Sequence, residues 1–392
     1  MKHFFKLSAV AVALIAHSAY ADTAHVEQSN GGNTTITQST GNAGTTANVI
    51  QQFGSLINIT QSGAGNLENA TITQQDSDNT YASITQSANA TKATITQFAD
   101  SQPSSVNNAS ITQSGVDSIG TLSQVGSISS ANLEQTGTQS HATITQAGNK
   151  LVVNASQSGS NNALTLSQQG ALNEASVSQS GNNGTVTIAQ YPYQNSTDVT
   201  QSASDSSMTV LQNGDSSHAL LSQSGNNNAL TLSQYGSYGE ANITQTGDNS
   251  TVNATQHSYD NAAITQSALD STITLTQNDN SNATINQEGS ANSINLNQSA
   301  SSANITQSGS NNVIAGLTGD TSAATQLNSD VTISQTGIEG KIYLHQVGTA
   351  SGQAILTQGG NFNTLSLDQQ VAGHSAFLSQ AGTGNILTVV QK

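Results

Sequence analysis

The sequence has no cysteine, no tryptophan and no arginine, and only two prolines among its 392 residues. The missing cysteine excludes a disulfide scaffold, a zinc site with thiolate ligands and catalysis by a thiol. Charged residues make up 7% of the chain, against about 25% in ordinary globular proteins. Aromatic residues make up only 4%. This composition argues against an ordinary enzyme built around one compact core.

The charge that is present is mostly negative. There are 22 acidic residues and 6 basic ones, which gives a formal net charge of -16. Binding to nucleic acid through its phosphates needs clustered Lys and Arg, so we expect no nucleic-acid partner. Disordered chains are typically rich in Pro, Lys or Glu. This chain is rich instead in Ser, Thr, Asn, Gln, Ala and Gly, so its composition is not typical of disorder.

Residues 1–21 have the layout of a secretory signal peptide. A short basic start is followed by an apolar run at residues 7–16, which is too short to span a membrane as a helix. Ala19–Ala21 supplies the small residues of a cleavage site. We expect cleavage before Asp22, and we expect the mature chain, residues 22–392, to be exported.

Glutamine recurs at a fixed interval of 11 residues over much of the chain. Each of these glutamines ends a short alternation of apolar and polar residues, and 13 steps follow one another without a slip, at Gln113, Gln124, Gln135, Gln146, Gln157, Gln168, Gln179, Gln190, Gln201, Gln212, Gln223, Gln234, Gln245 and Gln256. The series extends with small insertions and deletions from Gln28 to Gln391. Such self-similarity predicts a repeat architecture, here a single repeat domain over residues 22–392. The repeats are weaker in residues 22–112 and 308–330, where Thr318 stands in the place of a glutamine.

Each unit reads as one strand followed by a tight turn. In residues 140–146, Ala142, Ile144 and Gln146 alternate with His141, Thr143 and Thr145, and alternate residues of a strand point to opposite faces. A glycine often stands two residues after the glutamine, where turns favour positive φ. The pattern predicts an all-β fold of about 17 stacked coils, each of 22 residues in strand-turn-strand-turn order: a β-solenoid with amyloid-like cross-β stacking.

The regular glutamine needs a structural explanation, because it falls on the apolar face of each strand. A buried amide without partners costs a few kcal/mol. In a stack with aligned repeats, each carboxamide can donate to the next rung and accept from the previous one. We therefore predict that the 14 regular glutamines form a structural ladder, and that the Ser or Asn six residues earlier acts in the same way.

The spacing of these polar residues resembles the curlin repeat of bacterial curli fibre subunits, Ser-x5-Gln-x4-Asn-x5-Gln. Two stretches match it in full, namely Ser217, Gln223, Asn228 and Gln234, and Ser281, Gln287, Asn292 and Gln298. Many other units match with Asn, Gly or Asp in place of Ser, and the resemblance covers nearly all of residues 28–391. The chain thus looks like a curlin subunit with an expanded number of repeats.

The resemblance implies an extracellular functional amyloid, a pilus- or fimbrium-like cell-surface fibre that builds biofilm matrix and mediates adhesion and cell aggregation. The implied partners are further copies of the chain, a curli-type nucleator or major subunit, and an outer-membrane secretion channel with its accessory proteins. It implies secretion through the periplasm and no cofactor. We further expect the open ends of the solenoid to be the functional sites, because unpaired strand edges template new strands.

Acidic residues fall mainly in turns. With two units to a coil, we place one set on one edge of the column, namely Asp215, Asp260 and Asp279. We place a second set on the other edge, namely Asp205, Asp248, Asp270 and Glu288. The simplest interpretation is a solvated acidic surface that keeps the monomer soluble. Mutual repulsion that delays stacking, and weak calcium sites, are the alternatives.

Residues for catalysis are not evident. The histidines of the mature chain are His25, His141, His218, His257, His345 and His374. In the sequence pattern they share no repeat position with a carboxylate, so we expect neither an enzyme nor a metal site. Two further functions stay open, a non-polymerising secreted adhesin and an ice-binding protein. Recurring outward Thr-x-Thr pairs favour ice binding, but Glu134 and Asp198 interrupt a regular rank of threonines.

Overall fold

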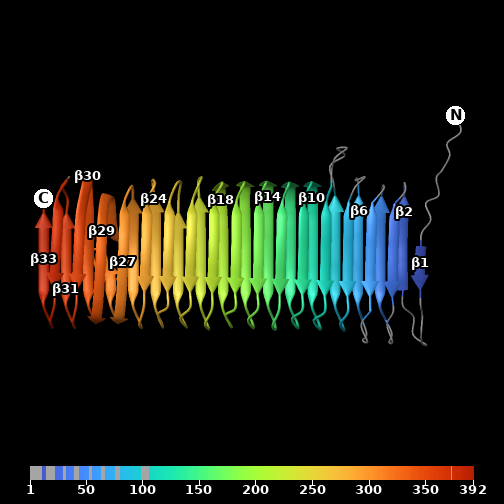
Figure 1. The fold of residues 1–392 in the computed structure, drawn as a ribbon, viewed down its shortest axis with the longest axis horizontal. Coiled ribbons are helices and arrows are strands. Elements are labelled where there is room, and N and C mark those ends of the chain that lie inside the picture. The colour runs from blue at the N-terminus through green and yellow to red at the C-terminus, as the bar shows by residue number, and fades with distance from the viewer. Residues whose placement is uncertain are drawn as a thin grey trace. The chain divides into compact units, whose positions relative to one another are not determined.

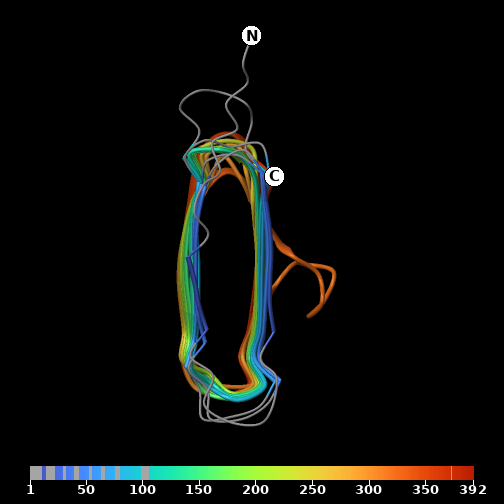
Figure 2. The same ribbon diagram turned by 90° about the vertical axis from the view of Figure 1, so that its right-hand side faces the viewer.

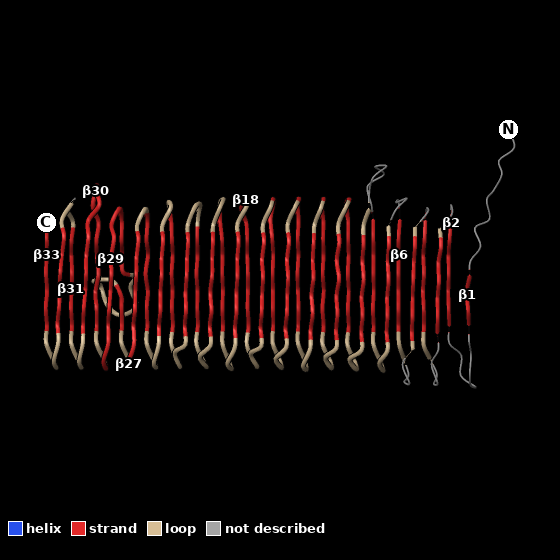
Figure 3. Tube along the Cα trace, viewed as in Figure 1, coloured by secondary structure: helices blue, strands red, loops and turns tan. Residues whose placement is uncertain are grey.

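The computed structural model describes residues 11–14, 23–29, 32–38, 44–52, 55–62, 67–75, 80–98, 106–371 and 373–392. All regular elements in these ranges are β-strands joined by turns (Figure 3). No helix in them has the length and apolar character needed to cross a membrane. The predicted all-β solenoid is thereby confirmed. The predicted signal peptide lies outside the described residues except for β1 (Ala11–Leu14).

The chain divides into two compact units, Met1–Asn195 and Ser196–Lys392, so the single repeat domain stays a prediction. The strands of the first unit after β1 are β2 (Thr23–Ser29), β3 (Asn33–Gln38), β4 (Thr46–Gln52), β5 (Leu56–Gln61), β6 (Asn69–Gln75), β7 (Tyr81–Gln86), β8 (Lys92–Phe98), β9 (Asn108–Gln113), β10 (Ile119–Ser127), β11 (Ser130–Gln135), β12 (His141–Asn149), β13 (Val152–Gln157), β14 (Ala163–Ala171), β15 (Glu174–Gln179) and β16 (Thr185–Tyr193).

The second unit continues the same order (Figure 1). Its strands are β17 (Ser196–Gln201), β18 (Ser207–Asp215), β19 (His218–Gln223), β20 (Ala229–Tyr235), β21 (Glu240–Gln245), β22 (Thr251–Gln256), β23 (Asn261–Gln266), β24 (Thr272–Asn278), β25 (Asn282–Gln287), β26 (Ser293–Ser299), β27 (Ser302–Ser310), β28 (Val313–Ala315), β29 (Ala324–Ile338), β30 (Lys341–Gln358), β31 (Thr364–Gln369), β32 (Ser375–Gln380) and β33 (Ile386–Gln391).

Before the irregular stretch around β28 to β30, strands within each unit pair in parallel with the strand two positions later in the chain, so each unit has two walls. In the first unit β10 pairs with β12 and β12 with β14, while β11 pairs with β13. The register aligns equivalent residues, such as Gln124 with Gln146 and then Gln168. Figure 2 looks along the stacks and shows the walls joined by turns at two edges. Even-numbered strands thus form one wall and odd-numbered strands the other; in the second unit this order holds up to β27.

The core of each unit is the narrow layer between its walls. In β12, Ala142 and Ile144 point inward and are at most 2% exposed, whereas Thr143 is exposed. The same alternation recurs along the other walls, because side chains alternate strictly along a strand. A few Ala, Ile, Leu and Val side chains per rung therefore suffice to build a continuous core.

The turns contain a feature that the glycine pattern did not reveal. The residue four positions after each ladder glutamine from Gln113 to Gln245 adopts a left-handed conformation, and this includes side chains as bulky as Ile128 and Leu172. Glycine is required at a different place, where backbones of successive rungs come close. Gly148 has φ +148°, and a Cβ there would lie 1.8 Å from the carbonyl oxygen of Gly170.

The weak stretch predicted at residues 308–330 holds an excursion from one wall. β26 pairs first with β28 and then with the start of β29, so residues 315–323 stand opposite Asn295 alone. The expectation that Thr318 replaces a ladder glutamine is wrong, because Gln326 pairs with Gln298 and occupies that position. The excursion shifted the apparent spacing of the repeat.

Candidate assembly surfaces

The predicted glutamines form two ladders in each unit, one along each wall. All 14 are at most 1% exposed. In the first unit Gln113 Nε2 donates to Gln135 Oε1 over 2.8 Å, and Gln124 Nε2 donates to Gln146 Oε1 over 2.8 Å. In the second unit Gln223 Nε2 donates to Gln245 Oε1 over 2.9 Å. Each ladder bond therefore joins successive rungs of the same wall.

The second N–H of each ladder amide reaches across the core, which sequence reasoning missed. Gln124 Nε2, on the even wall, donates to the carbonyl of Asn108 on the odd wall over 3.0 Å. Gln146 Nε2 reaches Ser130 O in the same way over 3.2 Å. The spacing of 16 residues between donor and acceptor recurs along the chain and is the signal that was available. One amide thus stabilises both the stack and the closure of the coil.

Asn and Ser side chains six positions before ladder glutamines supply further bonds between rungs. Asn162 Oδ1 accepts from the backbone N–H of Gly184, 2.9 Å away on the next rung, and its Nδ2 donates to Gly181 O over 2.7 Å. Where serine stands there, its hydroxyl takes the acceptor role, as Ser206 Oγ does for the N–H of Asn228 at 3.0 Å. These buried groups satisfy backbone donors at the corners of the coil.

Asp260 occupies this corner position, so its assignment to a solvated acidic edge is wrong. It is 1% exposed. Its two carboxylate oxygens accept from the backbone N–H groups of Ser281 and His257, each over 2.7 Å. Burial raises the pKa of Asp260 above its ordinary value, and the charge of Asp279 adds to this, while the two N–H bonds and His257 act in the opposite direction.

The other acids of the two predicted sets lie at the turns. Asp205, Asp248, Asp270 and Glu288 follow odd-numbered strands, whereas Asp215 and Asp279 end or follow even-numbered ones. Asp248 and Asp270 are on successive rungs, since the N–H of Asp270 donates to Asp248 O over 3.1 Å. Within the described ranges, no three His, Cys, Asp or Glu side chains gather in a way that could hold a metal ion.

The expectation that no histidine pairs with a carboxylate is also wrong. His345 on β30 and Asp368 on β31 share a repeat position, and His345 Nδ1 lies 2.8 Å from Asp368 Oδ1. Although burial alone would raise it, the pKa of Asp368 is lowered, because His345 and Gln370 contribute hydrogen bonds to its carboxylate. The pair lies on the outer face of the wall, where it links two rungs.

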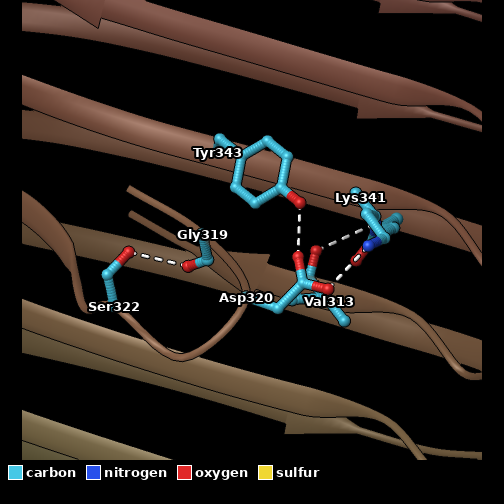
Figure 4. Close-up of polar contacts among 7 residues, drawn as sticks. Val313, Gly319, Asp320, Ser322, Lys341 and Tyr343 are labelled. Carbon is cyan, nitrogen blue, oxygen red and sulfur yellow. Dashed lines mark hydrogen bonds and ion pairs between the residues drawn. The ribbon is translucent and has the colours of Figure 1, made fainter. Parts of the chain in front are cut away.

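The excursion is fastened to the outer face of its wall (Figure 4). Asp320 accepts hydrogen bonds from Lys341 Nζ, over 2.6 Å, and from the hydroxyl of Tyr343, both on β30. These bonds lower the pKa of Asp320. On the other side, Asn295 Nδ2 of β26 donates to Thr321 O over 3.0 Å. Residues 316–323 are therefore held over both neighbouring rungs.

β33 has a strand partner on one side only within the described residues. It pairs with β31, and Gln369 Nε2 donates to Gln391 Oε1 over 2.8 Å. Leu387 and Val389 stand at core positions but are partly exposed, whereas the side chains below them, Leu365 and Leu367, are fully buried. The last rung thus presents a row of backbone groups, an amide and core side chains to solvent.

Residues 159–191 and 203–236 match the family model of the curlin associated repeat. The chain contains curlin repeats. Both matched segments hold three ladder glutamines each, which lie in the walls described above. A comparison with curated proteins gives no match. The curlin repeats and the solenoid fold together point to a structural protein.

Proposed function

We propose that the chain is a secreted structural subunit that self-assembles end to end into extracellular curli-like amyloid fibres, which serve as biofilm matrix and mediate surface adhesion and cell aggregation. The observation that carries the proposal is the edge of β33 that has no strand partner among the described residues. Its edge has the same hydrogen-bonding pattern and side-chain register that join the rungs inside each unit. A strand with the same repeat can therefore continue the stack.

The added rung is favourable for three reasons. It covers Leu387 and Val389, and completing the burial of such side chains contributes about 1 kcal/mol each. It pairs the free backbone edge of β33. It also extends the ladder through Gln391, whose Nε2 lies 3.5 Å from Ser375 O and has no further rung of this chain to donate to among the described residues. The contacts repeat those within the chain, so growth is expected to continue.

The test compares two pairs of substitutions in the same strand. Leu387→Lys with Val389→Lys places charge on the core face of the last rung. The matched control, Ile386→Lys with Val390→Lys, places equal charge on its outer face, where the native side chains are 79% and 54% exposed. We expect the first pair to abolish or strongly slow fibre growth, and the control to grow as the wild type does. Equal growth of both would contradict templating by β33.

The same proposal includes the route and the partners of the subunit. We propose secretion through the periplasm, passage through a curli-type outer-membrane channel with its accessory proteins, and contact with a nucleator or major subunit at a fibre end. The curlin repeats support this proposal. Deleting the channel from the host should leave the chain inside the cell, as measured by immunodetection on intact cells.

A second candidate function, ice binding, is favoured by one observation. Glu134 and Asp198, which interrupt the threonine rank in the sequence, lie on odd-numbered strands, β11 and β17. On the even-numbered strands from β6 to β20, the central outward residue is threonine throughout. Thermal hysteresis of the purified monomer tests this candidate, and its absence at high protein concentration would exclude it.

A further inference from the structure

The two walls of each unit differ in the chemistry of their outer faces. On β6 to β16 of the first unit, the central outward residue of each even-numbered strand is threonine, and successive threonines are aligned in the register: Thr71, Thr94, Thr121, Thr143, Thr165 and Thr187. The second unit has a corresponding row on β18 to β24, with Thr209, Thr231, Asn253 and Thr274. We call this face of each unit the threonine wall.

Carboxylates in the strand segments are found on the opposite face. From β4 to β26, the outward positions of the even-numbered strands, counted up to the ladder glutamine, hold no Asp or Glu. The odd-numbered strands hold Glu134 and Glu174 in the first unit and Asp198 and Glu240 in the second. In a chain with 22 acidic and 6 basic residues, the threonine wall is thus free of the charge that keeps copies apart.

We propose that the threonine wall is a lateral interface, on which a second copy of this chain packs with its own threonine wall. This inference rests on the proposed function, because it assigns the face through which fibres associate side by side. Flat sheets with short β-branched side chains approach to about 10 Å and interdigitate. The copies face each other through walls whose outward strand positions hold no carboxylate and, on β8, one lysine, Lys92, while their acidic walls point to solvent and keep the assembly soluble.

The excursion at residues 316–323 sets the limit of this interface in the second unit. It stands off the wall that contains β26 and β30 (Figure 2). Its bonds to Asn295, Lys341 and Tyr343 hold it across three rungs. A second sheet cannot come within packing distance of those rungs. We therefore expect contact over β18 to β24 and not beyond β26.

The decisive experiment places the same charge on each wall of the first unit. Thr143→Glu with Thr187→Glu modifies β12 and β16 of the threonine wall. The control, Ser110→Glu with Asn154→Glu, modifies β9 and β13 of the odd wall at the equivalent central position. Fibres of each are scored by electron microscopy for the fraction of filaments in bundles, and growth is followed by thioflavin T.

We expect the threonine-wall variant to reduce bundled filaments by about tenfold or more, the change that corresponds to 1.4 kcal/mol. Its growth rate should remain that of the wild type, and the control should form bundles as the wild type does. Equal bundling of both variants overturns the inference. If the wild type forms no fibres, the proposed function fails, and sedimentation velocity then tests the interface as a dimer that only the threonine-wall variant loses. Thermal hysteresis lost in that variant would instead assign the wall to ice.

Discussion

Replacing a single ladder glutamine should weaken three rungs at once. Gln168 on β14 accepts from Gln146 over 3.0 Å, donates to Gln190 over 2.7 Å, and also donates to Val152 O over 3.1 Å. Gln168→Met keeps the length of the side chain and removes all three bonds. Gln146 then loses its acceptor and Gln190 loses the donor from this rung. Since a buried polar group without its partner costs about 1–3 kcal/mol, we expect a loss of roughly 2–6 kcal/mol.

The neighbouring residue provides the matched control. Gln169 is on the same strand but points outward and is exposed, so Gln169→Met should change stability by less than about 0.5 kcal/mol. Native-state hydrogen exchange suits the comparison, because a stack of repeats need not unfold in one step. Backbone amides of β12, β14 and β16 should lose protection in the Gln168 variant only. Equal protection in both variants would refute the ladder as a source of stability.

Three further predictions concern single positions. The pKa of Asp260 is raised in the folded chain, so its contribution to stability is fully present below the unfolded pKa and is lost as pH rises through the folded pKa. Asp260→Asn should therefore be more stable than the wild type at neutral pH. The urea midpoints of the variant and the wild type should converge as the pH is lowered towards about pH 3. Asp320→Asn removes a surface ion pair, so global stability should fall by less than about 1 kcal/mol, while amides of residues 316–323 exchange faster. Gly148→Ala should destabilise by roughly 2 kcal/mol or more, because its Cβ meets the next rung, and Gly319→Ala, with positive φ but open space, should cost less in thermal unfolding.

The solenoid could be predicted because two periods agree in the sequence. The alternation within a unit gives the strand and its faces, and the 11-residue interval gives the stacking. The ladder partners of Gln113 to Gln256 follow from that interval alone. The bonds that cross the core do not follow from the interval, because they depend on how the two walls are placed opposite each other.

The errors arose where tertiary structure changes the meaning of a position. Asp260 was placed in a solvated turn because acidic residues are rarely buried, yet its corner offers two backbone donors. Thr318 was placed in a wall because the sequence cannot show that a loop leaves a strand and returns to it. The sequence shows the threonine rank as interrupted because consecutive units read as one surface, whereas Glu134 and Thr143 lie on opposite walls.

Assembly of the purified mature chain tests the central claim most directly. Residues 22–392 at micromolar concentration would be followed by thioflavin T fluorescence, and the end product would be viewed by electron microscopy. The account predicts a lag, a rise that added seeds shorten, and unbranched fibres with a meridional reflection at about 4.8 Å. A β-rich monomer that stays soluble for days, with or without seeds, would contradict it.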